Sequence, residues 1–480
     1  MVTRELIDPR SVVVVGGSDD VNKPGGAVLR NLLESPFKGD VYVVNPKSDN
    51  VQGAKTYRTV EELPDVECAI IAAAAKFCLQ TVEVLARVKG TKAFVILSAG
   101  FGEESKEGAE LEHKIVGIIN SVGGSLIGPN CTGILTSNYN GSFVSPVPHV
   151  DPMGVDFVSG SGATAIFIVD NGLRKGIKFS RVFSVGNSAQ IGVEEVLEYL
   201  DESFEEGKSS RIKLLYIESI TKPGKFLRHA SSLRRKGCRI AAIKSGSSEA
   251  GGRAASSHTG ALSSPDVAVE ALFRKAGIVR CYGREELMTV AAVFMYPELK
   301  GRNIAIVTHA GGPAVMLTDA LSDGGMNIPH LEGPKAKALL EKLFPGSSVA
   351  NPIDFLATGT AEQLGQIIDA CNNDFDEVDG TAVIFGSPGL FPIFDVYEVL
   401  ADKIKKSPKP IFPIFPSYGW VKDEVDGFVE NGGVYFPDEV MFGRALAKVY
   451  NTPGPQPENA GMPAVDAVRI RRVGESAGNG

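Results

Sequence analysis

Residues 11–33 read SVVVVGGSDDVNKPGGAVLRNLL, and they set the expected fold class. The run of valines indicates a buried strand, and Gly16 and Gly17 predict a turn at its end. The apolar segment 27–33 predicts the helix that follows. A strand, a glycine-rich turn and a helix in this order are typical of a parallel α/β sheet, where free N–H groups at the helix start face a phosphate.

The end of the next strand narrows the choice of ligand. Residues 41–44 form this expected strand, and Asn45, Pro46 and Lys47 follow it. A site for NAD usually carries an Asp or Glu here, which binds the ribose hydroxyls. A lysine in place of that acid favours a ligand with an additional phosphate. A structural βαβ unit that binds no nucleotide stays open as the alternative at this point.

The alternation of strands and helices continues along the first third of the chain. Strands are expected at 67–74, 93–97 and 125–127, and helices at 77–88 and 111–122. Two of these strands run into SAGFGE at 98–103 and GPNCTG at 128–133. Because the carboxyl ends of parallel strands share one edge of a sheet, these small polar residues predict a ligand site there. We predict one doubly wound domain over residues 1–145.

Two further α/β units follow a proline-containing connection at 141–152. In the second unit, SGSGAT at 159–164 joins a strand to an apolar helix at 165–172, which again offers N–H groups to an anion. The other expected elements are strands at 154–158, 214–219, 239–243, 303–308, 381–385 and 410–415, helices at 193–200, 265–276, 314–321 and 362–370, and a loop at 351–355. We predict domains at 146–295 and 296–460, then a linker or tail at 461–480.

Residues 244–262, KSGSSEAGGRAASSHTGAL, are too rich in Gly and Ser to build a core. We expect a flexible loop that carries His258, one of six histidines in the chain. A neutral imidazole at pH 7 is a nucleophile, and a carboxylate at a nearby strand end, Glu218, would orient it. A loop histidine that caps another group, and a surface acid at 218, are the alternatives that the local residues leave open.

Composition excludes several classes of protein. The chain has 480 residues, a net charge of -8 and 22% charged residues, which predicts about three globular domains and argues against nonspecific nucleic-acid binding. No apolar run is long enough to span a membrane, and the first residues lack the apolar core of a signal peptide. Six scattered cysteines without a CxxC pair predict neither a zinc site nor a disulfide framework, and therefore a reducing cytoplasm.

Together, the motifs resemble a known family. In chain order they are GGSDDVNKPGG, VNPK, SAGFGEE, IGPNCTGI, SGSGA, SVGN, YIES, IKSGSSEAGGRAASSHTGAL, THAGGPA and NPIDF. This set is similar to the α-subunit, or N-terminal α-half, of the NDP-forming acyl-CoA synthetases, which include ADP-forming acetate–CoA ligases and are related to succinyl-CoA synthetase. The resemblance covers residues 4–460. It implies a Rossmann-like CoA-binding domain followed by two flavodoxin-like domains of the succinyl-CoA synthetase type.

The resemblance also implies an acid–thiol ligase reaction, acyl-CoA + ADP + phosphate ⇌ acid + CoA + ATP. Phosphate attacks the thioester to give an acyl phosphate, a histidine takes the phosphoryl group, and its loop carries the group to ADP. His258 matches that histidine, and Glu218 matches the glutamate that holds it. Residues that match the phosphate-binding helix start are Ser161, Gly162 and Ala163. Residues that match the CoA site are Gly16, Gly17, Ser18, Lys23, Pro24, Gly25, Asn45, Pro46, Lys47, Ser98, Ala99, Gly100, Asn130 and Cys131.

The sequence departs from the family pattern in two places, and the first bears on the expected partners. The ATP-grasp portion, which would hold Mg2+ with ADP or ATP, is absent, so we expect a separate subunit or a truncated fusion in a hetero- or homo-oligomer. The final RIRRVGESAGNG resembles the joint to that portion. Family members also often differ from GSPGLF at 386–391. The acyl group, the choice of ADP over GDP, the stoichiometry and the physiological direction are not encoded in readable motifs.

Two other functions compete with this interpretation. A regulatory CoA-binding protein without phosphoryl transfer would typically lack the histidine, whereas His258 stands in an intact SHTGAL and Glu218 is present. A nicotinamide-dependent dehydrogenase would need the missing acid after the second strand. The ligase is therefore the favoured hypothesis.

Overall fold

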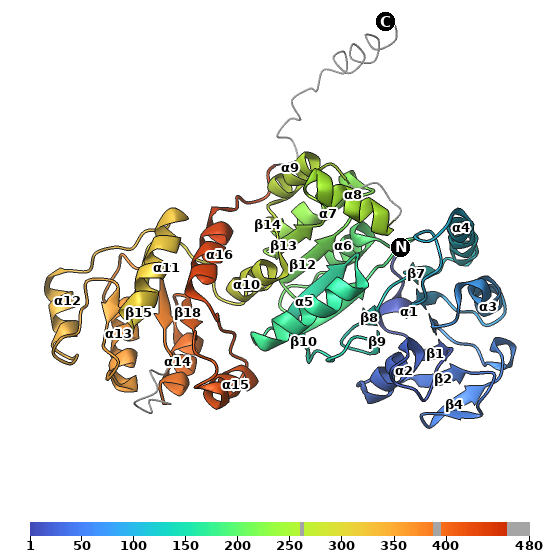
Figure 1. Ribbon diagram of the computed structural model, residues 1–480, viewed down its shortest axis with the longest axis horizontal. Coiled ribbons are helices and arrows are strands. Elements are labelled where there is room, and N and C mark those ends of the chain that lie inside the picture. The colour runs from blue at the N-terminus through green and yellow to red at the C-terminus, as the bar shows by residue number, and fades with distance from the viewer. Residues whose placement is uncertain (260–263, 387–394, 458–480) are drawn as a thin grey trace, which may run out of the picture.

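The computed structural model describes residues 1–259, 264–386 and 395–457, with the side chains of 256–259 outside that description. The chain forms three α/β units in a row, with the second unit between the first and the third (Figure 1). The predicted tail at 461–480 and most of the segment 386–391 lie outside the described residues. No helix among the described residues is both long and apolar enough to cross a bilayer.

The first unit is a doubly wound sheet with the strand order β3-β4-β2-β1-β5-β6-β7. Its strands are β1 (Ser11–Val15), β2 (Asp40–Val44), β3 (Asn50–Val51), β4 (Ala54–Tyr57), β5 (Cys68–Ile71), β6 (Ala93–Ile96) and β7 (Ser125–Ile127). Its helices are α1 (Arg4–Ile7), α2 (Pro24–Glu34), α3 (Ala75–Arg87) and α4 (Lys106–Ser121), with a 3-10 turn at Val60–Glu62. β1 pairs in parallel with β2 on one side and β5 on the other, so the order of the strands reverses beside β1. This reversal is where open α/β sheets bind their ligands.

The second unit has the strand order β14-β13-β12-β10-β11-β8-β9. Its strands are β8 (Gly133–Leu135), β9 (Asn140–Ser142), β10 (Val150–Ser159), β11 (Phe179–Ser184), β12 (Ile212–Ile217), β13 (Arg239–Lys244) and β14 (Val279–Cys281). Its helices are α5 (Gly162–Arg174), α6 (Val193–Glu202), α7 (Pro223–Arg235), α8 (Glu249–Thr259), α9 (Asp266–Ala276) and α10 (Arg284–Phe294). β8 and β9 pair antiparallel at one edge, so the chain enters this sheet earlier than the boundary expected at 145.

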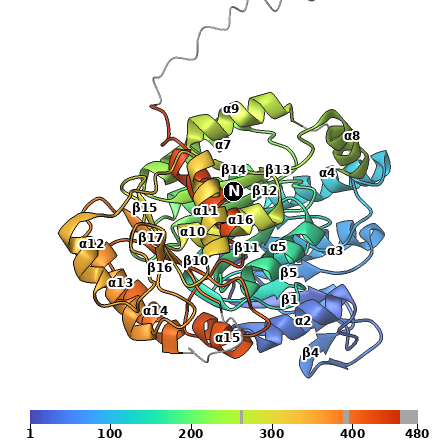
Figure 2. The same ribbon diagram turned by 60° about the vertical axis from the view of Figure 1, so that its left-hand side comes forward.

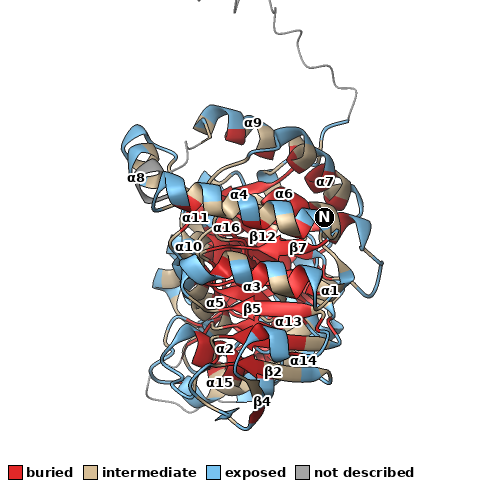
Figure 3. Cartoon of the chain, turned by 90° about the vertical axis from the view of Figure 1, so that its right-hand side faces the viewer, coloured by how far each residue is buried: buried red, intermediate tan, exposed pale blue. Residues whose placement is uncertain are grey.

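The third unit is a parallel sheet with the order β16-β15-β17-β18. Its strands are β15 (Ile304–Thr308), β16 (Ile353–Asp354), β17 (Gly380–Ile384) and β18 (Ile411–Ile414). Its helices are α11 (Gly311–Asp323), α12 (Gly333–Leu340), α13 (Ala361–Asn373), α14 (Asp395–Lys406), α15 (Lys422–Glu430) and α16 (Glu439–Asn451). Helices cover the sheets, so strands such as β5 and β12 are buried while the outer faces of α3 and α4 are exposed (Figure 3). The predicted α/β class, with its repeated strand–helix alternation, is confirmed.

The flexible loop predicted around His258 is wrong for most of its length, because residues 249–259 form the helix α8. Ser248 caps this helix, since its Oγ accepts a hydrogen bond from the Gly251 N–H at 3.0 Å. Glu249 pairs with Arg253 one turn later at 2.7 Å. The cap, the ion pair and the high helix propensity of the alanine and charged residues thus offset the low helix propensity of the glycines. The prediction from Gly and Ser content did not take these local contributions into account.

Other differences are short strands and earlier helix starts. The predicted loop at 351–355 contains β16, which pairs with β15. The connection expected at 141–152 contains the end of β9 and the start of β10. α2 begins at Pro24, because a proline fits the first helical position. α4 begins at Lys106, where Ser105 accepts a hydrogen bond from the Gly108 N–H at 3.0 Å.

Candidate active site at the junction of the first and second domains

The turn after β1 brings the predicted glycines to the carboxyl edge of the first sheet. Gly16 has a φ of +85°, and a Cβ there would lie 3.1 Å from the Ala72 carbonyl oxygen at the end of β5. A Cβ on Gly25 would lie 2.2 Å from the Gly16 carbonyl oxygen, so the start of α2 packs directly on the turn. Only glycine permits this approach, which places the first N–H groups of α2 at the strand-order reversal.

Asn45, Pro46 and Lys47 lie beside this turn, at the end of β2. The Asn45 Nδ2 donates to the Gly17 carbonyl oxygen at 2.8 Å, and its Oδ1 accepts from the Lys47 N–H at 2.8 Å. Lys47 is exposed, and Lys23 is exposed beside Asp20 at 3.4 Å. Ser18 and Pro24 complete the same edge. Two exposed ammonium groups therefore stand next to a helix start, an arrangement that attracts phosphate groups.

The loops after β6 and β7 are tied together at the same edge. The Ser98 Oγ donates to the Ala73 carbonyl oxygen, and the Asn130 N–H donates to the Ser98 carbonyl oxygen at 2.9 Å. Ala99 and Gly100 follow, and the Gly100 N–H donates to Glu103 at 2.7 Å. All predicted CoA-site residues thus lie on the carboxyl edge of one sheet, although their role in binding stays a prediction.

Cys131 is not a nucleophile in this setting. Its side chain is buried, and its Sγ contacts the Ile96 carbonyl oxygen at 3.2 Å. Burial raises the pKa of Cys131 to about 12, so the thiolate is scarce at neutral pH. Cys131 serves as an apolar wall residue.

A pocket of about 610 Å³ lies between the first and second domains. Of the predicted site residues, it is lined by Asn130, Cys131, Ser161, Gly162, Ala163 and Glu218. Ala255 of α8 also lines it, three residues before His258 in the same helix. The predicted phosphate-binding residues, Glu218 and the loop after β7 therefore share one cavity. The turn after β1 and the end of β2, which carry other predicted CoA-site residues, do not line it. Figure 2 shows α8 at the margin of the second domain, on the side of α4.

The start of α5 supplies the donors of this pocket. Ser161 caps the helix, and its Oγ accepts from the Thr164 N–H at 3.4 Å. The N–H groups of Gly162 and Ala163, in the first turn, donate to no protein acceptor among the described residues. A Cβ on Gly162 would lie 3.0 Å from the Thr132 methyl group, so glycine keeps the helix start close to the loop after β7. Free N–H groups and the positive end of the helix dipole suit an anion.

Glu218 follows the carboxyl end of β12 and is half-buried in the wall of the pocket. It lies near Gly160, where a Cβ would be 3.5 Å from the Glu218 Cγ. The side chain of His258 falls outside the described residues. The structure therefore places Glu218, the α5 start and the α8 backbone around one space. No group of three or more metal-ligating side chains is found among the residues described.

Three residues that we did not select join the two domains at this pocket. The Asn187 Nδ2, at the end of β11, donates to Glu103 and, at 3.2 Å, to Glu112. Asn187 also donates its backbone N–H to the Pro129 carbonyl oxygen at 3.0 Å. SAGFGEE and SVGN contained Glu103 and Asn187, but nothing in the sequence showed that these motifs meet. This contact fixes the 98–103 loop against the second sheet.

The two carboxyl groups differ in acidity. Burial alone would raise the pKa of Glu103, but hydrogen bonds from Asn187 and from the Gly100 and Phe101 N–H groups outweigh it and lower that pKa. Burial raises the pKa of Glu112, and the neighbouring Glu103 charge adds to the rise. Glu103 is therefore the fixed negative charge of the pair.

Two family descriptions match the chain. A CoA binding domain matches residues 10–137, and a succinyl-CoA ligase like flavodoxin domain matches residues 152–294. The two matches cover the first and second sheets and lie on either side of the pocket.

Comparison with known proteins extends the similarity over most of the chain. The α subunit of the ADP-forming acetate–CoA ligase II of Pyrococcus furiosus is 34% identical over 435 residues, which are 89% of this chain and 93% of that protein. The α subunit of ligase I of the same organism is 31% identical and covers 94% and 97%. An ADP-forming acetate–CoA ligase of Methanocaldococcus jannaschii is 37% identical over 74% of this chain. The match spans only 49% of that longer relative.

A solved structure shows the same arrangement. Acetyl-coenzyme A synthetase 1 of Ca. Korarchaeum cryptofilum, in complex with phosphate and ADP, has a TM-score of 0.82 and 28% identity. The comparison covers 93% of this chain and 96% of that one. The near-complete coverage of two α subunits, together with the CoA-binding and succinyl-CoA ligase-like domains, shows that this chain belongs to the ADP-forming acyl-CoA synthetase family, as its α part.

Proposed function

We propose that this chain carries the acyl and phosphohistidine half of an ADP-forming acyl-CoA synthetase. The single observation that carries the proposal is the shared pocket, in which the α5 start, Glu218 and α8 face the loops at the edge of the CoA-binding domain. Inorganic phosphate attacks the thioester and displaces CoA, giving an acyl phosphate. His258 then takes the phosphoryl group and releases the acid, and the phosphohistidine passes the group to ADP.

Each residue role follows from charge and position. The Gly162 and Ala163 N–H groups, capped by Ser161, hold the phosphoryl oxygens through the helix dipole. Glu218 orients the imidazole of His258 and stabilises its positive charge during transfer. The pocket lining holds four glutamates and no lysine or arginine among the described residues, so backbone donors supply the attraction for phosphate there.

The residues at the first sheet fit CoA. The phosphates of CoA would accept hydrogen bonds from the N–H groups of the turn at 16–18 and of the start of α2. The exposed ammonium groups of Lys23 and Lys47 would add positive charge beside them. The thioester end would reach Asn130 and Cys131, which line the pocket. The close approach of Gly25 to Gly16 packs the start of α2 against the turn, as in folds that bind a pyrophosphate at this position.

ATP formation takes place with a second component. The ligase relatives include separate α subunits and a longer chain of which the match spans only 49%, so we propose an ATP-grasp β-subunit or fused portion that binds Mg2+ with ADP or ATP. We place the enzyme in the cytoplasm, where its six unbridged, buried cysteines would stay reduced. The carboxylic acid and acyl-CoA are its small-molecule substrates.

Phosphorylation of His258 tests this function without the partner. Acetyl-CoA or a larger acyl-CoA is added with labelled phosphate, and the protein is analysed by intact mass and peptide mapping. We expect a base-stable, acid-labile label at His258 in the wild type and none in His258→Asn, with CoA affinity unchanged. Label that persists in His258→Asn would overturn the scheme. Wild-type protein that binds CoA but takes no label from any acyl-CoA would instead favour the regulatory CoA-binding function.

The Glu218→Gln variant tests whether Glu218 orients the His258 imidazole without contributing to CoA binding. The amide keeps the size of the side chain but lacks the charge, so the labelling rate should fall by at least about 100-fold while CoA affinity stays the same. Glu202→Gln, an exposed acid at the end of α6, is the matched control and should label normally. Equal labelling rates for both variants would remove Glu218 from the mechanism.

A further inference from the structure

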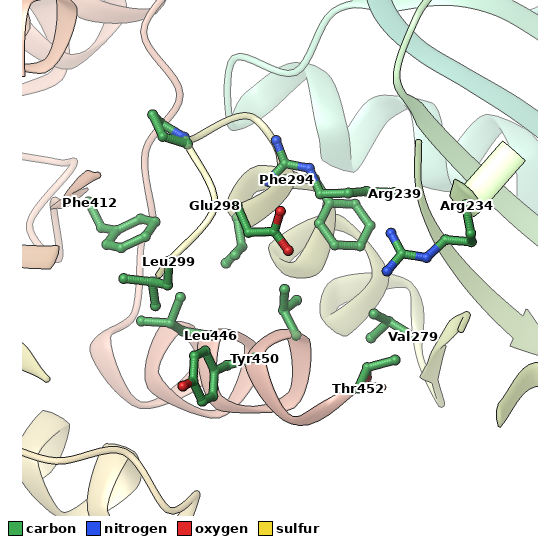
Figure 4. A pocket seen from close by; sticks show the side chains of 13 residues that line it. Arg234, Arg239, Val279, Phe294, Glu298, Leu299, Phe412, Leu446, Tyr450 and Thr452 are labelled. Atoms are coloured by element: carbon green, nitrogen blue, oxygen red, sulfur yellow. The ribbon is translucent and has the colours of Figure 1, made fainter. Parts of the chain in front are cut away.

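A second cavity, of about 170 Å³, lies where the second and third domains meet (Figure 4). Arg239 and Val279, which begin β13 and β14, line it. The active-site residues Ser161 and Glu218 instead follow the carboxyl ends of β10 and β12. Because these four strands are parallel, the cavity stands at the opposite edge of the sheet from the active site.

Most of the residues that line this cavity are apolar, and they come from both domains. Val279 and Phe294 belong to the second domain, whereas Phe412, Leu446 and Tyr450 belong to β18 and α16 of the third. In Figure 4, Leu446 and Tyr450 lie on the α16 side, across from Phe294. A protein cavity of about 150 Å³ has room for benzene, so this space of about 170 Å³ has room for a molecule the size of one aromatic ring.

Two arginines supply positive charge to the cavity. The Arg234 Nη1 donates to the Cys238 carbonyl oxygen at 2.7 Å, and the Arg239 Nη1 donates to the Tyr296 carbonyl oxygen at 2.9 Å. Arg239 also lies over the Phe294 ring, 5.6 Å from its centre. The buried Arg234 Nε has no hydrogen-bond partner within the described part of the chain. Both guanidinium groups thus keep donors that the described residues do not use.

Neither arginine forms an ion pair with a described residue, unlike other sheltered cations of the second domain. Lys213 pairs with Asp156 at 2.5 Å, Lys175 pairs with Glu285, and Arg280 pairs with Asp266 at 2.5 Å. Burial lowers the pKa of Arg234 and of Arg239, as expected for cations with too little compensating charge. A sheltered charge without a partner is costly, and an anion in the cavity would remove that cost.

Glu298 limits the charge of such an anion. It lies on the exposed linker between α10 and β15, and its carboxylate points toward the same space as Arg234 (Figure 4). Two arginines and one glutamate leave one excess positive charge. A monoanion balances this charge, whereas a phosphate monoester with two charges would be repelled by Glu298.

We propose that this cavity binds a small organic monocarboxylate, whose carboxylate pairs with Arg234 and Arg239 and whose ring or branched group packs between Phe294 and Leu446. The planar fork of an arginine suits a carboxylate, and the apolar walls suit the rest of the molecule. The bound acid joins the second domain to the third through α16. This site lies outside the proposed acyl-CoA chemistry and does not depend on it.

Benzoate is the probe, and benzamide, which has the same shape without the charge, is its control. Calorimetric titration of the full chain should detect benzoate binding, at least about tenfold stronger than benzamide binding. Arg234→Met should abolish the preference for benzoate. Val449→Phe, which fills the cavity without changing any charge, should abolish binding of both compounds. Arg211→Met removes a nearby exposed arginine that does not line the cavity and should bind as the wild type does.

Three results would overturn the proposal. The first is no benzoate binding by the wild type up to about 10 mM, the range of very weak ligands. The second is equal affinity for benzoate and benzamide. The third is benzoate binding that survives in Val449→Phe, because the acid would then occupy another pocket, such as the active site. Val449→Phe keeps the test decisive even if Arg234→Met does not fold.

Discussion

Asp201, at the end of α6, shows how single carboxylates hold the second domain together. Its oxygens accept from the Ser232 hydroxyl at 2.7 Å and from the Lys236 ammonium at 2.8 Å, and one contacts the His229 Nδ1 at 2.9 Å. Burial alone would raise the pKa of Asp201, but the hydrogen bonds from Lys236 and Ser232 outweigh it and lower that pKa below its ordinary 3.8. The charged form is therefore favoured in the folded state.

This shift predicts a loss of stability in acid. The unfolded state binds the proton more readily, so the contribution of Asp201 is complete above pH 3.8 and is lost as the pH falls through the lower folded value. Asp201→Asn should lower the free energy of unfolding by about 1–3 kcal/mol at neutral pH. It should also weaken the pH dependence of that free energy below pH 3.8. Urea unfolding midpoints measured across the acid range test this, with Glu202→Gln as the exposed neighbour control. The prediction would be contradicted if the urea midpoint of Asp201→Asn fell in acid as steeply as that of the wild type.

Among the elements, α8 is the one whose stability bears most directly on the proposed function. It is capped by Ser248 and carries the Glu249–Arg253 pair, yet Gly251 and Gly252 lie in its first turns. Each glycine in a helix costs about 0.5–1 kcal/mol relative to alanine. The helix that carries His258 is therefore formed but weak, which suits a segment proposed to carry a phosphoryl group between two sites.

Gly252→Ala should strengthen α8 without a clash. A Cβ at this position has the Gly246 carbonyl oxygen, at 3.8 Å, as its nearest neighbour. Amide hydrogen exchange in α8 should slow by about two- to fivefold. Gly224→Ala in α7, where a Cβ meets nothing within 4 Å, is the matched control and should leave exchange in α8 unchanged. Unchanged or faster exchange in Gly252→Ala would show that helix propensity does not limit α8.

At the scale of the whole molecule, the second and third domains share one apolar core. This core includes Leu287 of α10, Leu317 of α11 and Phe442 of α16, all fully buried. α10 packs on α5 on one side and on α16 on the other. A separate core fills the first domain, and another spans the first and second domains. The second and third domains are therefore expected to unfold as one unit.

Phe442→Ala tests this coupling. Phe442 contacts the rings of Phe412 and Phe436, and its removal should cost about 3–5 kcal/mol. Scanning calorimetry should show one lowered transition for both domains, because the lost contacts lie in their common core. Trp420→Ala, at a side chain that is 73% exposed, should leave the transition in place. A scan in which the third domain alone melts earlier would refute a shared cooperative unit.

The local pattern of the sequence was sufficient for the elements that rely on near neighbours. The valines of β1, the small residues after the parallel strands and the serine before α5 each predicted an element that the structure contains. Alternating strands and helices predicted the α/β class for the same reason: short-range periodicity follows from which face is buried. The motifs at the strand ends also predicted a ligand site at the carboxyl edge of the first two sheets, and this role stays a prediction.

Only the tertiary structure decided what these motifs meet. β8 and β9 leave the first domain and complete the second sheet, and β16 forms only because β15 lies beside it. Glu103 meets Asn187, and Arg234 lines one cavity together with residues of α16, across long stretches of chain. Such contacts depend on long-range packing free energy, which no local pattern of residues records.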